Sequence, residues 1–202
     1  MTAECSEATT SLHDPATAAW MWSIETGDRL WTTAEAAYRC GAFTLDGVTI
    51  ALGRADGGVD LMASKSGQLL WRAWGGANEE VTSLAWSRDG SSLAVGLSSG
   101  VVRRLDVTSG ERLSKVQAVE GPVVLLVHDR VIVASDGERI VMISAGRKRF
   151  EIACARACAM AMTLQGSLVV AGVMPEGGHW RLRIGSLQGD NATGDTTQKV
   201  HL

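Results

Sequence analysis

A short glycine motif recurs four times along the chain. The four copies are Thr26-Gly27-x-x-Leu30-Trp31, Ser66-Gly67-x-x-Leu70-Trp71, Ser109-Gly110-x-x-Leu113-Ser114 and Ala145-Gly146-x-x-Arg149-Phe150. Successive glycines are 40, 43 and 36 residues apart. A recurrence of about forty residues indicates a chain built from repeated supersecondary units, which bury a core by stacking on one another.

The sequence around each glycine is typical of short strands. The clearest unit spans residues 68–110 and contains four β-rich runs separated by turns. These runs are Gln68–Ala73, Val81–Trp86, Ser92–Leu97 and Val101–Val107. No segment shows the period of an amphipathic helix. Four short strands in about forty residues are typical of one β-propeller blade, in which the glycine turn returns the chain to the outer edge.

We therefore predict an all-β propeller of four recognisable blades. The repeat units are residues 28–67, 68–110, 111–146 and 147–189, with a partial blade begun by an orphan strand at Trp20–Ile24. The other expected strands are Val48–Gly53, Val59–Met62, Val123–Val127, Val131–Ala134, Arg139–Ile143, Cys158–Leu164, Ser167–Val173 and Trp180–Ile184. Residues 1–18 lack a hydrophobic period and are expected to be a disordered leader. Residues 19–189 would form the propeller domain, and the tail at 190–202 has room for one closing strand.

Four blades are few for repeats of this length. Propellers have about four to eight blades, and those with repeats of about 40–45 residues tend to be larger than four. The ring is therefore small, open, completed by another chain, or part of a longer protein. The sequence leaves these alternatives open.

Composition excludes several classes of partner. The 202 residues carry a formal net charge of −3, which gives no basic field for a phosphate backbone, so nucleic-acid binding is not expected. No apolar run approaches the roughly 20 residues that span a bilayer, so membrane insertion is not expected. Four cysteines are too few for a disulfide framework and fit a reducing compartment. We therefore expect a cytoplasmic or nuclear protein.

Aromatic residues at a fixed repeat position are expected to pack between blades. Trp31 and Trp71 each follow the repeat glycine by four residues. A large ring at such a position buries itself against the next blade. Trp74, in the loop at 74–80, departs from the strand pattern. It is a candidate for an exposed protein contact, with a local role in the core as the alternative.

Charged residues in and after this loop are further candidate protein contacts. They are Glu79, Glu80, Arg103 and Arg104. Adjacent residues of a strand point to opposite faces, so Arg103 and Arg104 would not form one anion-binding patch. The pattern favours a solvated sheet edge over an anion site for the two arginines.

No catalytic, metal or cofactor site is predicted. Cys154 and Cys158 supply two metal ligands at most, and the four histidines show no paired spacing that would complete a tetrahedral site. No nucleophile-elbow or catalytic-triad pattern is present in the sequence. We expect a non-catalytic chain without a small-molecule substrate, which binds protein subunits of a larger complex.

Residues 81–110 resemble a WD-repeat blade. They follow the pattern V-x-x-L-A-W-x-x-D-G-x-x-L-A-V-G-x-x-x-G-x-V-x-x-x-D-x-x-x-G. Leu105 stands where the signature Trp precedes Asp106, no Gly-His pair opens the blade, and Ser98-Ser99 replaces the usual turn aspartate. The resemblance implies degenerate WD repeats that lack the family's standard hydrogen-bond network.

The order of motifs over residues 20–187 is similar to the N-terminal propeller of anaphase-promoting complex subunit 4. The matching runs are Ile50-Ala51-Leu52, Gly58-Val59-Asp60-Leu61, Leu70-Trp71, residues 80–90, Val119-Glu120-Gly121-Pro122-Val123 and Phe150-Glu151-Ile152-Ala153. The resemblance implies a non-catalytic subunit of a ubiquitin-ligase assembly that contacts its neighbours through rims and edges. Degenerate blades of this pattern also occur in intraflagellar-transport and vesicle-coat scaffolds.

A second family is the alternative. Residues 58–71 also resemble the tryptophan-docking repeat of quinoprotein propellers, in which a turn glycine precedes Leu-Trp. That resemblance implies an exported enzyme that holds pyrroloquinoline quinone above a calcium ion. We expect no export signal in this chain, the sequence contains no adjacent cysteines, and the pattern fades after the second repeat.

Overall fold

The computed structural model describes residues 18–33, 35–73, 75, 79–128, 131–153, 157–162, 167–173, 180–186 and 196–199. The expected leader lies outside these residues except for its last position. Trp74 also lies outside them.

Four antiparallel sheets of four strands each make up most of the described chain. The first sheet contains β3 (Tyr38–Phe43), β4 (Thr49–Arg54), β5 (Val59–Ala63) and β6 (Leu69–Ala73). The second contains β7 (Val81–Trp86), β8 (Ser92–Leu97), β9 (Val101–Asp106) and β10 (Arg112–Gln117). The third contains β11 (Val124–His128), β12 (Val131–Ser135), β13 (Arg139–Ser144) and β14 (Arg147–Ala153). The fourth contains β15 (Ala157–Met162), β16 (Ser167–Val173), β17 (Trp180–Ser186) and β18 (Thr196–Lys199).

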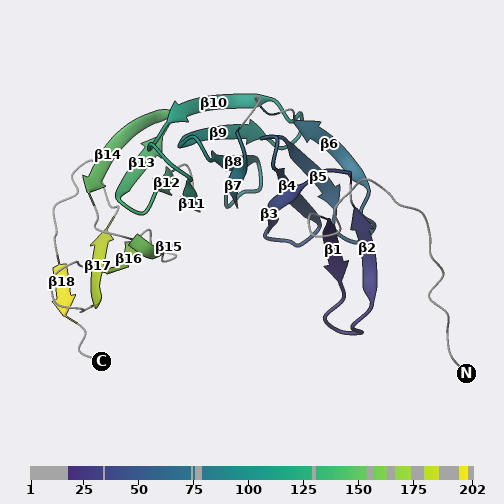
Figure 1. The fold of residues 1–202 in the computed structure, drawn as a ribbon, viewed down its shortest axis with the longest axis horizontal. Helices are drawn as coiled ribbons and strands as arrows, with labels where there is room; N and C mark the ends of the chain where they lie inside the picture. Colours follow the sequence, from purple (N-terminus) through teal and green to yellow (C-terminus); the bar gives the residue numbers. More distant parts are fainter. Residues whose placement is uncertain are drawn as a thin grey trace, which may run out of the picture.

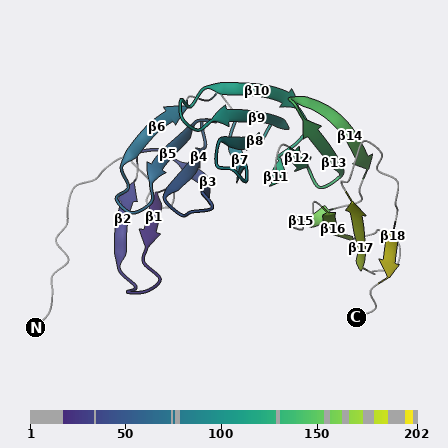
Figure 2. The same ribbon diagram turned by 180° about the vertical axis from the view of Figure 1, so that it is seen from behind.

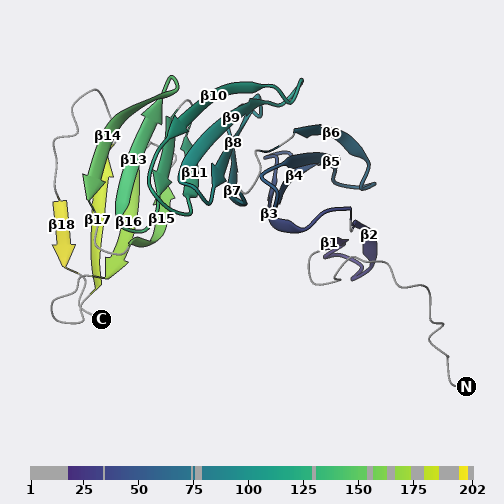
Figure 3. The same ribbon diagram turned by 45° about the horizontal axis from the view of Figure 1, so that its top comes forward.

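The sheets are arranged side by side in an arc. Strand order follows the sequence within every sheet, with the first strand on the inner side and the fourth on the outer side (Figure 1). Views from behind and from a tilted direction show the same succession of sheets (Figures 2 and 3). This is the blade arrangement of a β-propeller, as predicted. Among the described residues, the two ends of the arc lie apart and the ring does not close (Figure 1).

A two-stranded sheet stands before the first complete one. It consists of β1 (Ala19–Trp22) and β2 (Arg29–Thr33), which pair antiparallel. The expected orphan strand at Trp20–Ile24 is therefore wrong in two respects, because the strand ends at Trp22 and has β2 as its partner. β3 at Tyr38–Phe43 is a strand that the sequence pattern does not predict.

The repeat glycines all occupy the same turn, between the third and fourth strands of a sheet. Gly27, Gly67, Gly110 and Gly146 have φ values of 75°, 68°, 72° and 71°, which a residue with a Cβ adopts only with strain. Since Gly27 joins β1 to β2, these two strands correspond to the third and fourth strands of an incomplete sheet. Each sequence repeat therefore begins with the outer strand of one sheet and continues with three strands of the next.

The hydrophobic core lies between successive sheets. One cluster joins the first and second sheets through residues such as Val59, Leu61, Val95 and Leu97, each at most 3% exposed. A second cluster joins the second and third sheets. Complete burial of such a side chain contributes about 1.5–3 kcal/mol, so the faces between sheets hold the arc together.

Candidate functional site

The seam between the first and second sheets is closed on its outer side by a tryptophan. Trp71 on β6 donates its indole N–H to the backbone carbonyl of Val107 at 2.7 Å. Its ring covers Gly110 so closely that a Cβ at that glycine would lie 3.2 Å from ring atoms. The tryptophan thus docks on the glycine turn of the next sheet.

The preceding seam repeats this arrangement. Trp31 on β2 donates its indole N–H to the carbonyl of Ser64 at 2.7 Å, and a Cβ at Gly67 would lie 2.7 Å from its ring. The prediction that both tryptophans anchor the packing between blades is confirmed. At the following seam Ser114 takes the same place against Gly146, so the large ring is lost there.

A cavity of about 310 Å³ lies in the seam beside Trp71's docking turn. Its lining comes from both sheets and from the turns at their edges. The lining residues are Gly57, Val59, Arg72, Ala73, Val95, Arg103, Leu105, Gly110 and Arg112. Val59, Ala73, Val95 and Leu105 make part of this wall apolar. The guanidinium of Arg72 is turned to the other face of the first sheet, where it pairs with Asp60.

Three of the charged residues expected to contact proteins gather around this seam. Arg103 forms an ion pair with Glu79, which also accepts a hydrogen bond from Ser99 Oγ at 2.9 Å. Glu80, which directly precedes β7, pairs with Arg39 of β3 at 3.2 Å. This ion pair links the start of the second sheet to the first sheet. Arg103 is only 8% exposed, so the expectation that it lies on a solvated edge is wrong.

Arg104 lies on the opposite face of the same strand. It pairs in register with Ala94, whose side chain belongs to the core facing the third sheet, and donates from Nε to Ser92 Oγ at 2.9 Å. Arg103 instead pairs with Val95 of the core facing the first sheet. The two arginines do not form one patch, as predicted.

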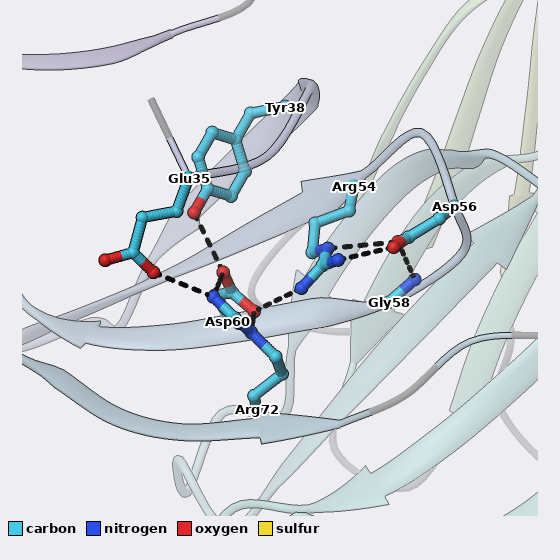
Figure 4. Close-up of polar contacts among 7 residues, drawn as sticks. All are labelled: Glu35, Tyr38, Arg54, Asp56, Gly58, Asp60 and Arg72. Carbon is cyan, nitrogen blue, oxygen red and sulfur yellow. Dashed lines mark hydrogen bonds and ion pairs between the residues drawn. The ribbon is translucent and has the colours of Figure 1, made fainter. Parts of the chain in front are cut away.

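A buried carboxylate lies on the face of the first sheet that is turned away from the second sheet. The sequence patterns did not predict it. Asp60 is 0% exposed and accepts hydrogen bonds from Arg72 Nε and Nη2 at 2.8 and 2.9 Å, and from the Tyr38 hydroxyl at 2.8 Å (Figure 4). Arg54 approaches it at 3.5 Å and also pairs with Asp56 (Figure 4). A charged residue in the middle of the apolar strand 59–63, with an arginine on the adjacent strand, was the signal that could have revealed this cluster.

The protonation of this cluster follows from its burial. Desolvation, followed by the hydrogen bond to Asp60, raises the pKa of Tyr38 to about 12. The bidentate contact with Asp60 raises the pKa of Arg72, which remains a cation. Neutral Tyr38 and cationic Arg72 therefore both act as donors to the carboxylate, which makes the cluster a fixed structural clamp.

Cys40 is a free thiol at the seam between the first two sheets. Its S–H donates to the carbonyl of Val81 at 3.7 Å. Burial raises the pKa of this thiol to about 11, so it stays protonated at neutral pH and behaves as a packing group. The side chains of Cys5, Cys154 and Cys158 fall outside the described part of the chain.

Within the described ranges, no grouping of three or more His, Cys, Asp or Glu side chains could hold a metal ion. The described segments also contain no helix long and apolar enough to cross a bilayer.

Two family models match parts of the chain. The WD40 domain of anaphase-promoting complex subunit 4 matches residues 49–131, and the outer membrane protein assembly factor BamB matches residues 98–191. The first match spans the seam that holds the cavity. A comparison with curated proteins finds no match.

Solved propeller structures share the fold at low sequence identity. A chain of the mitotic checkpoint complex superposes with a TM-score of 0.74 at 18% identity, covering 90% of this chain and 57% of that one. The RRP9 WD40 repeats give 0.64 at 15% identity, with 85% of this chain and 52% of that one covered. U3-55K gives 0.68 at 14% identity, with 94% and 57% covered. The chain thus spans little more than half the length of these structures. Its sheets and its repeat turns have the WD40-type β-propeller fold of these structures.

Proposed function

We propose that the chain is a non-catalytic protein-interaction scaffold and serves as a WD-repeat subunit of a multiprotein assembly. The observation that carries the proposal is the match of residues 49–131 to the WD40 domain of anaphase-promoting complex subunit 4. The specific role is that of a ubiquitin-ligase component in the cell cycle, located in the cytoplasm or nucleus.

The incomplete sheet supports a role within an assembly. β1 and β2 correspond to the last two strands of a blade, and among the described strands β1 pairs with β2 alone. Trp20 and Trp22 on β1 are 47% and 54% exposed. An unpaired strand edge with exposed aromatic residues is a template for strands from elsewhere, so this end of the arc suits a neighbouring subunit or a further part of the protein.

Native co-purification tests the proposal. The full chain, tagged at its end and expressed at its natural level in the cells it comes from, should elute as a stoichiometric complex that contains ubiquitin-ligase subunits. Mass spectrometry of the eluate identifies those subunits. Intraflagellar-transport or vesicle-coat subunits would replace the ligase role with another scaffold role, and a monomer under gentle conditions would contradict the proposal.

A second candidate function is a quinoprotein-type propeller enzyme. The docking of Trp31 and Trp71 on the following glycine turns favours it, because this is the geometry that the quinoprotein resemblance implies. Addition of pyrroloquinoline quinone and Ca²⁺ to the purified chain should then raise its melting temperature. An unchanged melting temperature would reject this candidate.

A further inference from the structure

β1 takes the place of a third strand in a sheet for which the described chain supplies no first or second strand. Its register with β2 repeats the register of β5 with β6, including the shift that follows the residue paired with the repeat tryptophan. In the complete first sheet, the second strand β4 pairs along the other side of β5. Among the described strands β1 has only β2 as a neighbour, so the backbone edge on its other side is open to a further strand.

Two tryptophans of β1 lie at positions that are buried in the complete sheets. Trp20 and Trp22 flank the residue that pairs with Trp31, and both are half-exposed. The residues at the same two positions of β5, β9 and β13 are at most 8% exposed. They are Asp60 and Met62, Arg103 and Leu105, and Val141 and Ile143. In the second and third sheets the apolar residues among them belong to the core shared with the preceding sheet, so the exposed face of β1 is one that a further sheet would cover.

The glycine turn between β1 and β2 lacks the cover that the other repeat turns have. A side chain from the outer strand of the preceding sheet lies 2.7, 3.2 and 3.3 Å from where a Cβ would stand at Gly67, Gly110 and Gly146. A Cβ at Gly27 would meet no atom of the described chain within 4 Å, and Ile24, three residues earlier, is fully exposed. The β1 end of the arc is therefore one side of a seam whose other side the described residues do not supply.

The second strands of the complete sheets show which sequence fits beside a third strand. β4 pairs with β5 through residues 50–53, which read Ile-Ala-Leu-Gly, and β8 pairs with β9 through residues 93–96, which read Leu-Ala-Val-Gly. Both runs are buried throughout. The glycine is needed because the first strand of the next sheet lies close, and a Cβ at Gly53 would stand 2.5 Å from Val81. The pattern that fits a third strand is therefore apolar-Ala-apolar-Gly.

We infer that β1 binds an extended segment of a partner protein with the pattern apolar-Ala-apolar-Gly, which pairs antiparallel with β1 as a second strand. In the register of β4 with β5, the two apolar residues of the segment lie beside Trp22 and Trp20, and its glycine lies beside Ala19. Backbone hydrogen bonds hold such an added strand, and its alternating side chains determine which segment fits. This inference rests on the proposed scaffold function and names the kind of segment that a partner would present.

A fluorescein-labelled peptide of this chain's own residues 80–97, which contains β7 and β8, is the probe for the first test. Fluorescence polarisation should show that it binds the purified full chain. The same peptide with Ala94→Glu should not bind, because the added strand would place a charge where β8 has a buried alanine. Trp20→Glu in the full chain should weaken binding of the unaltered peptide about tenfold, because it places a charge beside an apolar residue of the added strand.

Leu113→Glu is the matched control, since Leu113 is a half-exposed apolar residue on β10, the outer strand of the second sheet. This variant should bind the peptide as the parent chain does, with thermal melts used to verify that both variants are folded. Equal weakening by Leu113→Glu and Trp20→Glu would place the peptide elsewhere on the chain and overturn the inference. The absence of binding to the parent chain would overturn it as well.

Photo-crosslinking in the cells the chain comes from identifies the source of the strand. With p-benzoylphenylalanine in place of Trp20 in the full chain, mass spectrometry should map the cross-link to a segment of another protein with the pattern apolar-Ala-apolar-Gly. A cross-link to a second copy of this chain, to another part of the same polypeptide, or to a segment without the pattern would overturn the inference. Recovery of the same native complex by the parent chain and by Trp20→Glu would reject β1 as the contact without rejecting the scaffold function.

Discussion

Trp71 and Gly110 belong to different sheets, yet the indole ring of the first lies where a Cβ on the second would have to go. The ring also donates its N–H to Val107, three residues before that glycine. The same relationship joins Trp31 to Gly67, so the repeat motif encodes a contact between sheets as well as a turn within one. The contribution of this tryptophan–glycine contact to the free energy of unfolding can be measured by substitution.

Trp71→Phe retains an aromatic ring but removes the N–H that Val107 accepts. We expect a loss of about 1–3 kcal/mol in the free energy of unfolding, because a partly buried carbonyl is left without its donor. Trp71→Ala should cost more, about 3–5 kcal/mol, through the additional loss of packing. Urea titration followed by circular dichroism measures both. Trp22→Phe, at a half-exposed position, serves as the control and should change stability by no more than about 0.5 kcal/mol.

Gly67→Ala and Gly27→Ala separate the turn from the contact. Both glycines have positive φ in equivalent turns, and a Cβ at Gly27 would meet nothing within 4 Å. Gly27→Ala should therefore cost only the backbone strain of about 1–2 kcal/mol. Gly67→Ala must also displace the Trp31 ring and should lower the melting temperature further. Equal shifts for the two variants would contradict a docking role for Trp31.

Asp60→Asn tests the buried clamp of the first sheet. Removal of the charge leaves Arg72 and Arg54 without their shared carboxylate, and breaking a buried pair in this way costs about 3–5 kcal/mol. Glu35→Gln is the matched control, since Glu35 pairs with Arg72 at 3.1 Å from an exposed position. It should change the unfolding free energy by at most about 1 kcal/mol. If chemical denaturation shows comparable losses of unfolding free energy for the two variants, the buried carboxylate contributes no more to stability than the exposed one.

Asp89 predicts a pH dependence of stability. Hydrogen bonds from Ser87 and Ser91 lower the pKa of this exposed carboxyl from 3.8 to about 2. Because the folded-state pKa lies below the unfolded one, the contribution of Asp89 is present above about pH 4 and is lost as the pH falls towards 2. Denaturant titrations at pH 6, 4 and 2.5 measure the free energy of unfolding. The value for the parent chain should approach the value for Asp89→Asn at pH 2.5. A stability difference that is independent of pH would contradict this assignment.

The sequence predicted strands whose residues are themselves apolar and β-rich. It missed a strand that depends on pairing with a neighbouring strand. The strands Val81–Trp86, Ser92–Leu97 and Ser167–Val173 were predicted with their observed bounds, because apolar β-rich runs between turn residues depend on neighbouring positions only. The segment Tyr38–Phe43 was missed, since Arg39 and Gly41 interrupt its apolar pattern and its stability comes from pairing with β4.

The candidate site depended on contacts that sequence spacing does not reveal. Glu79 and Arg103 are both candidate protein contacts in the sequence. Their pairing across 24 residues depends on how the second sheet folds, and the burial of Arg103 depends on the packing of that sheet against the first. The same stacking creates the cavity and brings Arg112 to its wall. The sequence does not reveal the role of Asp60, because its arginine and tyrosine partners come from two other strands of the sheet.

The one-strand offset between sequence repeats and sheets has a practical consequence for dividing this protein. A fragment that stops at Gly110 keeps β7, β8 and β9 but loses β10, and the backbone edge of β9 is then bare. Boundaries placed instead in the connections at 74–80 or 118–123 keep every hydrogen-bonded ladder whole. The boundaries at which the chain can be divided without breaking a sheet are therefore shifted by one strand from the boundaries of the sequence repeat.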